Sequence, residues 1–166
     1  GLVDSCLLGH GSAAQLPVSP ASEWYPAALE TAYSPAPLSQ LTQRADDTEA
    51  DADTASAGAD TAGRYAGTAV TLLVNQENAF KTTAAQEIAD SLSRAGLSVT
   101  VEAVPWETYL QRLQDGSFDL YYGECRLTAD WDVLELVGTE GSLNYGGFSD
   151  EKTDTLLAAC RTADES

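Results

Sequence analysis

The residues best suited to chemistry stand together, directly after a short apolar run. The run, Phe118–Tyr122, is typical of a buried strand, and it stops at Gly123. Glu124, Cys125 and Arg126 then follow in succession. A carboxylate, a thiol and a guanidinium at the carboxyl end of a strand indicate a place where a small molecule can be bound or transformed, because open α/β sheets hold their ligands at that end.

The thiol of Cys125 raises the question of catalysis. A cysteine nucleophile needs a neighbouring base that converts it to the thiolate. The single histidine, His10, stands far earlier in the chain between two glycines, which is typical of a loop. The sequence has neither a GxSxG nucleophile elbow nor a phosphate-cradling GxxxxGKS/T motif. We therefore predict a protein that binds rather than catalyses, with a Cys125-dependent enzyme as the disfavoured alternative.

Alternating strand and helix patterns surround this stretch. Ala69–Val74 is a continuous apolar run of strand length, and Leu97–Val104 alternates apolar and polar residues, as a half-exposed strand near a sheet edge does. Ala79–Ala95 and Trp106–Leu113 carry apolar residues at helical spacing. With Phe118–Tyr122 as the third strand, the order is β-α-β-α-β. Crossovers of this length join parallel neighbours, which predicts an α/β fold.

The carboxyl ends of these parallel strands meet at one edge of the sheet, where we expect the ligand. The residues predicted to contact it are Asn75, Tyr121, Tyr122, Gly123, Glu124, Cys125, Arg126 and Asn144. Tyr121 and Tyr122 point to opposite faces if both stay in the strand, so at least one belongs to the core. Asn144 has the alternative role of holding the glycine-rich turn in which it stands. For Trp106 and Trp131 we expect core positions rather than stacking platforms.

By its amino-acid composition the chain divides into three parts. Residues 1–45 hold a helix end and a proline-rich segment, which we predict to be irregular and anchored to the core by Trp24 and Tyr25, with a short helix near its end. Residues 46–67 form an acidic low-complexity loop, where a solvated linker is favoured over a Ca²⁺ site because the EF-hand pattern is absent. Residues 68–166 supply the β-α-β-α-β core and its C-terminal helices.

Two further helices are predicted after the third strand. The first spans Asp130–Val137, with Asp130 as its N-cap, and the second begins after Ser149 as its cap. Cys160 lies on the apolar side of the second helix, so we expect this thiol in the core rather than in a reactive position.

The chain is strongly acidic. Its 166 residues carry a formal net charge of −18, with a pI of about 4.1. This acidity argues against nucleic acid and anionic membrane surfaces as partners; the alternative is that it reflects one solvated segment. The 3 cysteines include no CxxC pair, so neither a zinc site nor a disulfide scaffold is supported, and no cofactor is expected. No stretch is long and apolar enough to span a bilayer, and no basic lead-in marks a signal peptide.

Motifs spread along the chain resemble those of the family-5 extracellular solute-binding proteins of ABC importers, the dipeptide-, oligopeptide- and nickel-binding group. The matching positions are Leu2–Gly11, Ala14, Pro17 and Pro20, then Gly116, Phe118 and Asp119, then Gly141, Asn144, Gly147, Phe148 and Asp150, and finally Asp154 and Leu157. The resemblance runs from Gly1 to about Arg161 and is interrupted by the acidic segment.

The resemblance implies a fold, a function and partners. The fold is a lobe of periplasmic-binding-protein type II, with three α/β/α layers and a mainly parallel sheet. This chain then supplies much of the second lobe, and the ligand, a peptide or similar small molecule, lies between it and the missing first lobe. Membrane permease subunits are the other partners, and the location is periplasmic or lipid-anchored on the extracellular face. A ligand-sensing or surface interaction module built on the same lobe remains open.

The resemblance also marks one departure at the predicted site. Peptide binders of this family carry an aspartate a few residues beyond the third strand, where it holds the α-ammonium of the peptide. Leu127 stands at the matching position here, and Glu124 or Asp130 is a possible substitute. Arg126 suggests that the edge meets a carboxylate or another anionic group.

Overall fold

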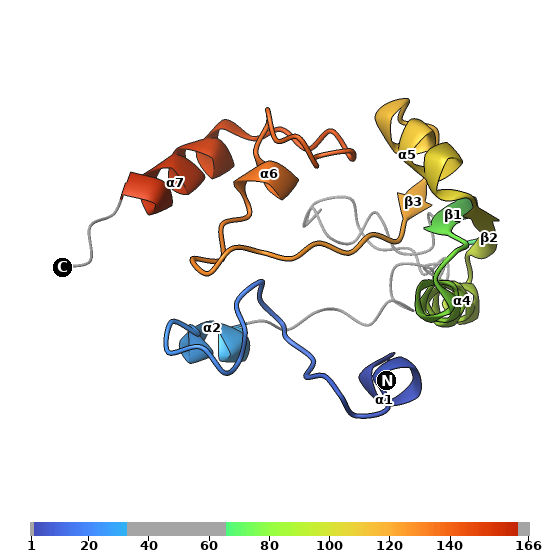
Figure 1. Cartoon of the computed structure of the whole chain (residues 1–166), viewed down its shortest axis with the longest axis horizontal. Helices are drawn as coiled ribbons and strands as arrows, with labels where there is room; N and C mark the ends of the chain where they lie inside the picture. Colours follow the sequence, from blue (N-terminus) through green and yellow to red (C-terminus); the bar gives the residue numbers. More distant parts are fainter. Residues whose placement is uncertain (1, 33–65, 163–166) are drawn as a thin grey trace, which may run out of the picture.

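A small parallel sheet organises the chain (Figure 1). The structure is a computed structural model that describes residues 2–32 and 66–162. Its strands are β1 (Ala69–Asn75), β2 (Ser98–Val104) and β3 (Leu120–Tyr121), in the order β2-β1-β3. Both neighbours pair with β1 in parallel. The predicted parallel topology is confirmed, and the alternating strand β2 lies at an edge of the sheet, as its pattern indicated.

Two helices cover opposite faces of the sheet. They are α4 (Ala79–Arg94), which connects β1 to β2, and α5 (Trp106–Gln114), which connects β2 to β3. Asn78 caps the start of α4 by accepting a hydrogen bond from the backbone N–H of Lys81 at 3.3 Å. The sheet and its two helices form the three α/β/α layers that we expected.

The core alternates between the two faces along β1, because successive side chains of a strand point in opposite directions. Leu72 and Val74 are buried against Ala85 on the α4 side. Leu73 is buried on the other side, against Tyr109 and Leu113 of α5. Burial on both faces explains why β1 is a continuous apolar run.

The third strand is shorter than its apolar run predicted. Of the expected Phe118–Tyr122, only Leu120–Tyr121 forms a strand. The side chain of Asp119 accepts a hydrogen bond from the N–H of Thr71 at 2.8 Å, so a carboxylate takes the place of a backbone acceptor where the strand begins. The N–H of Tyr122 still donates to the carbonyl of Leu73 at 2.9 Å, which holds the end of the run against β1.

The N-terminal part holds two short helices. The helix end predicted at the start is α1 (Leu2–Leu7), which contacts α4 and is followed by left-handed backbone at Leu8 and Gly9, with φ of +50° and +80°. The proline-rich segment is not irregular throughout, because α2 (Ala27–Ala32) forms directly after Pro26, where a proline favours a helix start. The expected anchoring by Trp24 is wrong, since this side chain is 65% exposed.

After β3 the first predicted helix starts later than expected. It spans only α6 (Leu134–Val137), rather than beginning at Asp130. The backbone of Trp131 has a φ of +59°, a left-handed conformation that cannot continue into a right-handed helix. Asp132 then accepts a hydrogen bond from the N–H of Leu134 at 2.8 Å, and Val133, without a side-chain cap, holds the N-cap position predicted for Asp130.

The last helix, α7 (Glu151–Thr162), differs from its prediction in two respects. Asp150, not Ser149, caps it, by accepting a hydrogen bond from the N–H of Thr153 at 2.7 Å. Cys160 is exposed rather than in the core, and none of the described residues of α7 is buried. The short helix predicted near the end of residues 1–45 and the acidic segment lie outside the described residues.

Candidate functional site

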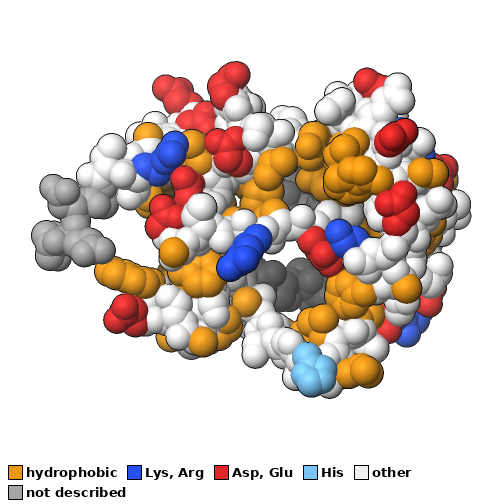
Figure 2. All heavy atoms as spheres, viewed as in Figure 1, with side chains coloured by type: hydrophobic (Ala, Val, Ile, Leu, Met, Phe, Trp, Pro, Cys, Tyr) orange, Lys and Arg blue, Asp and Glu red, His pale blue; other side chains and the backbone are white. Residues whose placement is uncertain are grey.

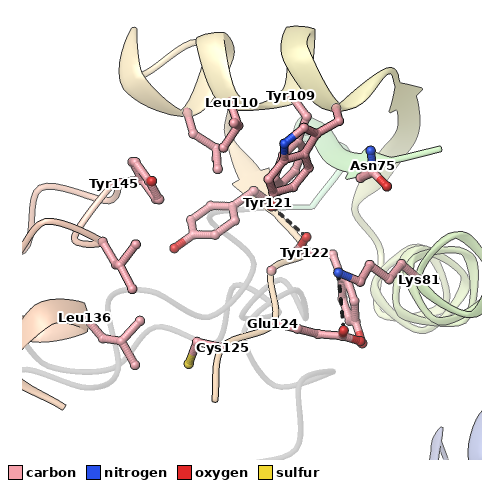
Figure 3. Close-up of a pocket in the computed structure, with 14 residues that line it drawn as sticks. Asn75, Lys81, Tyr109, Leu110, Tyr121, Tyr122, Glu124, Cys125, Leu136 and Tyr145 are labelled. Carbon is pink, nitrogen blue, oxygen red and sulfur yellow. Dashed lines mark hydrogen bonds and ion pairs between the residues drawn. The ribbon is translucent and has the colours of Figure 1, made fainter. Parts of the chain in front are cut away.

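A pocket of about 320 Å³ opens at the carboxyl edge of the sheet, between α5, the end of β3 and the segment that carries α6 (Figure 3). In the space-filling view, hydrophobic side chains gather over α5 and toward α6 (Figure 2). The residues that line the pocket are Asn75, Lys81, Trp106, Tyr109, Leu110, Leu113, Tyr121, Tyr122, Gly123, Glu124, Cys125, Leu136, Leu143 and Tyr145. The pocket lies at the edge where the sequence predicted a ligand.

Aromatic side chains form one wall of the pocket. Trp106 is 46% exposed and stacks on Tyr109, with ring centroids 5.6 Å apart and planes at 20°. Tyr121 meets Tyr145 edge to face at 6.1 Å. The expectation that Trp106 fills the core is therefore wrong. Trp106 is the first residue of α5 and is not among the buried residues of that helix.

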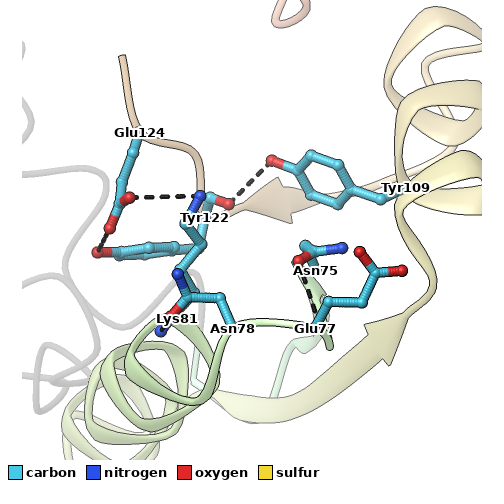
Figure 4. A network of polar contacts seen from close by, with 7 residues as sticks. All are labelled: Asn75, Glu77, Asn78, Lys81, Tyr109, Tyr122 and Glu124. Carbon is cyan, nitrogen blue, oxygen red and sulfur yellow. Dashed lines mark hydrogen bonds and ion pairs between the residues drawn. The ribbon is translucent and has the colours of Figure 1, made fainter. Parts of the chain in front are cut away.

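A small polar network crosses the opposite side (Figure 4). The ammonium of Lys81 lies 3.3 Å from Oε2 of Glu124, and the hydroxyl of Tyr122 lies 3.2 Å from Oε1 of the same carboxylate. The hydroxyl of Tyr109 donates to the carbonyl of Tyr122 at 2.9 Å. These contacts join α4, α5 and the end of β3, and they leave the pair of charged residues at the pocket neutral overall.

Asn75 also lines the pocket, at the carboxyl end of β1. It is the last residue of β1 and only 7% exposed. Its Oδ1 accepts a hydrogen bond from the N–H of Glu77 at 3.2 Å. Its Nδ2 is buried, and within the described part of the chain it has no hydrogen-bond partner.

The structure brings six of the eight predicted site residues together at this pocket. The two others are Arg126, which is exposed and does not line it, and Asn144. The amide of Asn144 donates to the carbonyls of Gly138 and Phe148, at 2.9 and 2.7 Å, and accepts from the N–H of Phe148. This amide therefore holds the glycine-rich turn, which was its alternative role. Tyr121 and Tyr122 pack on opposite faces of the sheet, as predicted.

Sequence reasoning missed several lining residues. Lys81 stands in the first turn of α4, directly after β1, and a cation at that end of a helix is unfavourable unless an acid is near. That position is a signal that could have pointed to an acidic partner at the edge. Leu136, Leu143 and Tyr145 come from the segment after β3. Their pattern differs in no way from that of ordinary core residues.

The arrangement is suited to binding. Among the described lining residues there is no histidine beside Cys125 to act as a base. Residues 2–32 and 66–162 contain no group of three or more His, Cys, Asp and Glu side chains placed to hold a metal ion. No helix in these same ranges has the length and hydropathy of a transmembrane span.

Burial at the pocket raises the pKa of two tyrosines. Desolvation, with the nearby Tyr121 and Tyr145, raises the pKa of Tyr109 from 10.0 to about 12. Desolvation and the neighbouring Glu124 carboxylate raise that of Tyr122 to about 12. Each phenol has a higher pKa in the folded protein than in the unfolded chain. The contribution of its protonated form to the free energy of unfolding is therefore complete below pH 10 and is lost as the pH rises through 12.

We expect these two phenols to ionise late in an alkaline titration followed by phenolate absorbance. Difference titrations of Tyr109→Phe and Tyr122→Phe against the unmodified protein isolate each hydroxyl, and each difference should have its midpoint near pH 12. Midpoints near the ordinary pKa of about 10 would show that these side chains are solvated.

Comparisons with known proteins place the chain among solute-binding proteins. Residues 1–132 match the family model described as "Bacterial extracellular solute-binding proteins, family 5 Middle". A comparison with curated protein sequences gives no match.

Solved structures share the fold. The oligopeptide-binding protein AppA from Bacillus subtilis, in complex with a nonapeptide, matches 98% of this chain with a TM-score of 0.65 and 20% identity. The pheromone receptor PrgZ matches 60% of the chain, with a TM-score of 0.51 and 27% identity. The substrate-binding domain of an oligopeptide ABC transporter from Bacillus anthracis also matches 60% of the chain, with a TM-score of 0.51 and 18% identity. The chain spans only 33%, 19% and 20% of these three proteins, respectively.

Proposed function

Since the chain belongs to the bacterial extracellular solute-binding proteins of family 5, we propose that it supplies one wall of a solute site that serves uptake by an ABC importer. The observation that carries the proposal is the pocket at the carboxyl edge of the sheet, with an aromatic wall and a neutral polar side. Pockets that bind small molecules combine these features, a mainly apolar lining and a few placed polar groups.

Two residues of the wall are left partly exposed, as expected of half of a two-lobed site. The indole of Trp106 is 46% exposed, and the side chain of Glu124 is 42% exposed. A second lobe that closes on the ligand by a hinge motion would cover these groups. Half of the contacts then come from a part of the protein outside these 166 residues.

A short peptide is the favoured ligand class. The structure of AppA was solved with a nonapeptide, and that of PrgZ describes its mode of peptide binding. Permease subunits in the membrane are the partners that such uptake requires. The family is extracellular by its description, and we propose a periplasmic location or a lipid anchor on the extracellular face for the whole protein.

Isothermal titration calorimetry with the full-length gene product tests this function. The ligands titrated are the tripeptides Ala-Phe-Ala, Ala-Leu-Ala, Ala-Lys-Ala and Ala-Glu-Ala. Mass spectrometry of the protein purified without denaturation identifies any solute that co-purifies with it. We expect the full-length protein to bind at least one peptide, and residues 1–166 alone to bind it at least about 100-fold more weakly, because half of the contacts are lost. Absence of peptide binding by the full-length protein, or equal affinity for the fragment, would refute the split site.

A ligand-sensing role is the second candidate. PrgZ, at 27% identity, is described as a pheromone receptor, so the same lobe also occurs in a signalling protein. Deleting the gene and measuring both peptide uptake and the transcriptional response to peptide separates the two. Loss of uptake supports transport, whereas loss of the response with uptake intact supports sensing.

A further inference from the structure

We propose that this pocket binds an uncharged, carbonyl-bearing part of the ligand next to an apolar side chain, with Nδ2 of Asn75 as the donor to the carbonyl oxygen. The inference rests on the proposed function and deepens it. It differs from the expectation raised by the sequence, in which Glu124 or Asp130 stands in for an aspartate that holds a ligand ammonium.

The first support is the buried amide of Asn75. A donor that loses water without gaining a partner costs about 1–3 kcal/mol, and buried polar groups are nearly always paired. Asn75 is 7% exposed, and its Nδ2 is without a partner in residues 2–32 and 66–162. Asn75 lines the pocket, and Nδ2 itself is shielded from solvent, so a ligand acceptor reaches this donor when the amide turns toward the filled site.

The orientation of this amide is fixed by its neighbour. Oδ1 of Asn75 accepts from the N–H of Glu77 at 3.2 Å. A flipped amide would bring the NH₂ group against that N–H, donor to donor, which is unfavourable. Oε1 of Glu77 accepts from the N–H of Trp106 at 3.2 Å, and no hydrogen bond joins this carboxylate to Nδ2 of Asn75. The free donor therefore belongs to Nδ2, and it requires an acceptor.

The second support is the pairing of the charges at the pocket. Both oxygens of Glu124 already accept, one from Lys81 and one from the Tyr122 hydroxyl (Figure 4). A ligand ammonium would therefore compete with Lys81 for a carboxylate whose charge is already balanced. Asp130 does not line the pocket, and a hydrogen bond from the Thr128 side chain contributes most to lowering its pKa. The described lining thus offers no unpaired charge to a charged ligand group.

The third support is the wall that faces this donor. Tyr109, Leu110 and Tyr121 line the same pocket as Asn75, and in Figure 3 Tyr109 lies between Asn75 and the other two. Aromatic and aliphatic surfaces favour an apolar group because its transfer out of water is favourable. A peptide carbonyl beside an apolar side chain places an acceptor and apolar surface next to each other, as the pocket requires.

The test compares matched substitutions of two neighbouring asparagines in the full-length protein. Asn75→Asp keeps Oδ1 for the Glu77 N–H and removes the donor, and Asn75→Leu removes both the donor and Oδ1 without adding charge. Asn78→Asp is the control: it adds the same charge three residues away, keeps the cap of α4, and lies outside the pocket lining. Affinity for Ala-Phe-Ala, Ala-Lys-Ala and Ala-Glu-Ala is measured by calorimetry, and the folding of each variant by its melting temperature.

The expected result is a loss of at least about tenfold in affinity for Ala-Phe-Ala in both Asn75 variants, and less than about threefold in Asn78→Asp. The wild type should also bind Ala-Phe-Ala at least about tenfold more tightly than Ala-Lys-Ala or Ala-Glu-Ala. Wild-type affinity in a folded Asn75→Leu variant, or equal binding of the charged peptides, overturns the inference and leaves the proposed function standing. Absence of binding of every peptide by the wild type overturns both.

Discussion

Replacing Trp106 with alanine is expected to weaken ligand binding by the full-length protein by about 2 kcal/mol or more, roughly thirtyfold in the dissociation constant. Trp106 is 46% exposed, lines the pocket and stacks on Tyr109, so its indole offers a large rigid surface to a ligand. Its removal leaves the sheet intact, because the backbone N–H of Trp106, not its side chain, makes the bond to Glu77. Calorimetry with the best-binding peptide measures the loss.

Trp24→Ala is the matched control for this substitution. Trp24 is also exposed, at 65%, but it does not line this pocket. We expect its removal to change the affinity by less than about twofold, as surface substitutions away from a site do. Equal losses at Trp106 and Trp24 would mean that tryptophan removal acts on the protein as a whole, and no loss at Trp106 would place the ligand elsewhere.

Replacing Leu73 with alanine should lower the free energy of unfolding by about 2–5 kcal/mol. Leu73 is fully buried at the centre of β1 and packs against Tyr109 and Leu113. Truncation removes buried apolar surface and leaves a cavity between the sheet and α5, which also supports the aromatic wall of the pocket. Urea denaturation followed by circular dichroism measures the change.

Leu120→Ala provides the comparison within the same sheet. Leu120 pairs with Leu72 in the register but is 40% exposed, so its truncation should cost about 1 kcal/mol or less. Similar costs at the two leucines would contradict the assignment of Leu73 to the core.

Local patterns were sufficient to predict the β-α-β-α-β order. The continuous apolar run of β1 follows from burial on both faces, and the alternation in β2 follows from its edge position. Each element carries its own period, so helix and strand are visible without knowledge of their partners. The parallel arrangement then follows from the length of the connections.

Features that depend on contacts between distant residues could not be predicted in this way. Asp119 shortens β3 because its side chain reaches the N–H of Thr71 on another strand. Trp131 prevents the early start of α6 through a left-handed backbone that its residue type disfavours. In both cases the tertiary structure overrides the local pattern.

Only part of the candidate site could be predicted, because some of its residues are brought together by contacts between distant elements. Parallel strands end at one edge, and this rule brought Asn75 and Glu124 together from far apart in the sequence. It did not show that Lys81 would neutralise Glu124, which requires knowing how α4 lies against the end of β3. Nor did it show that Trp106 would line the pocket and stay partly exposed, which depends on how the start of α5 packs.

A crystal structure of the full-length protein with its co-purified or calorimetrically defined peptide tests most directly whether this pocket is a wall of the solute site. The predicted result is ligand density against Trp106 and Tyr121, with a carbonyl oxygen within hydrogen-bond distance of Asn75 Nδ2 and a second lobe closed over it. Ligand density that leaves the pocket between Asn75, Trp106 and Glu124 empty would contradict the proposed site.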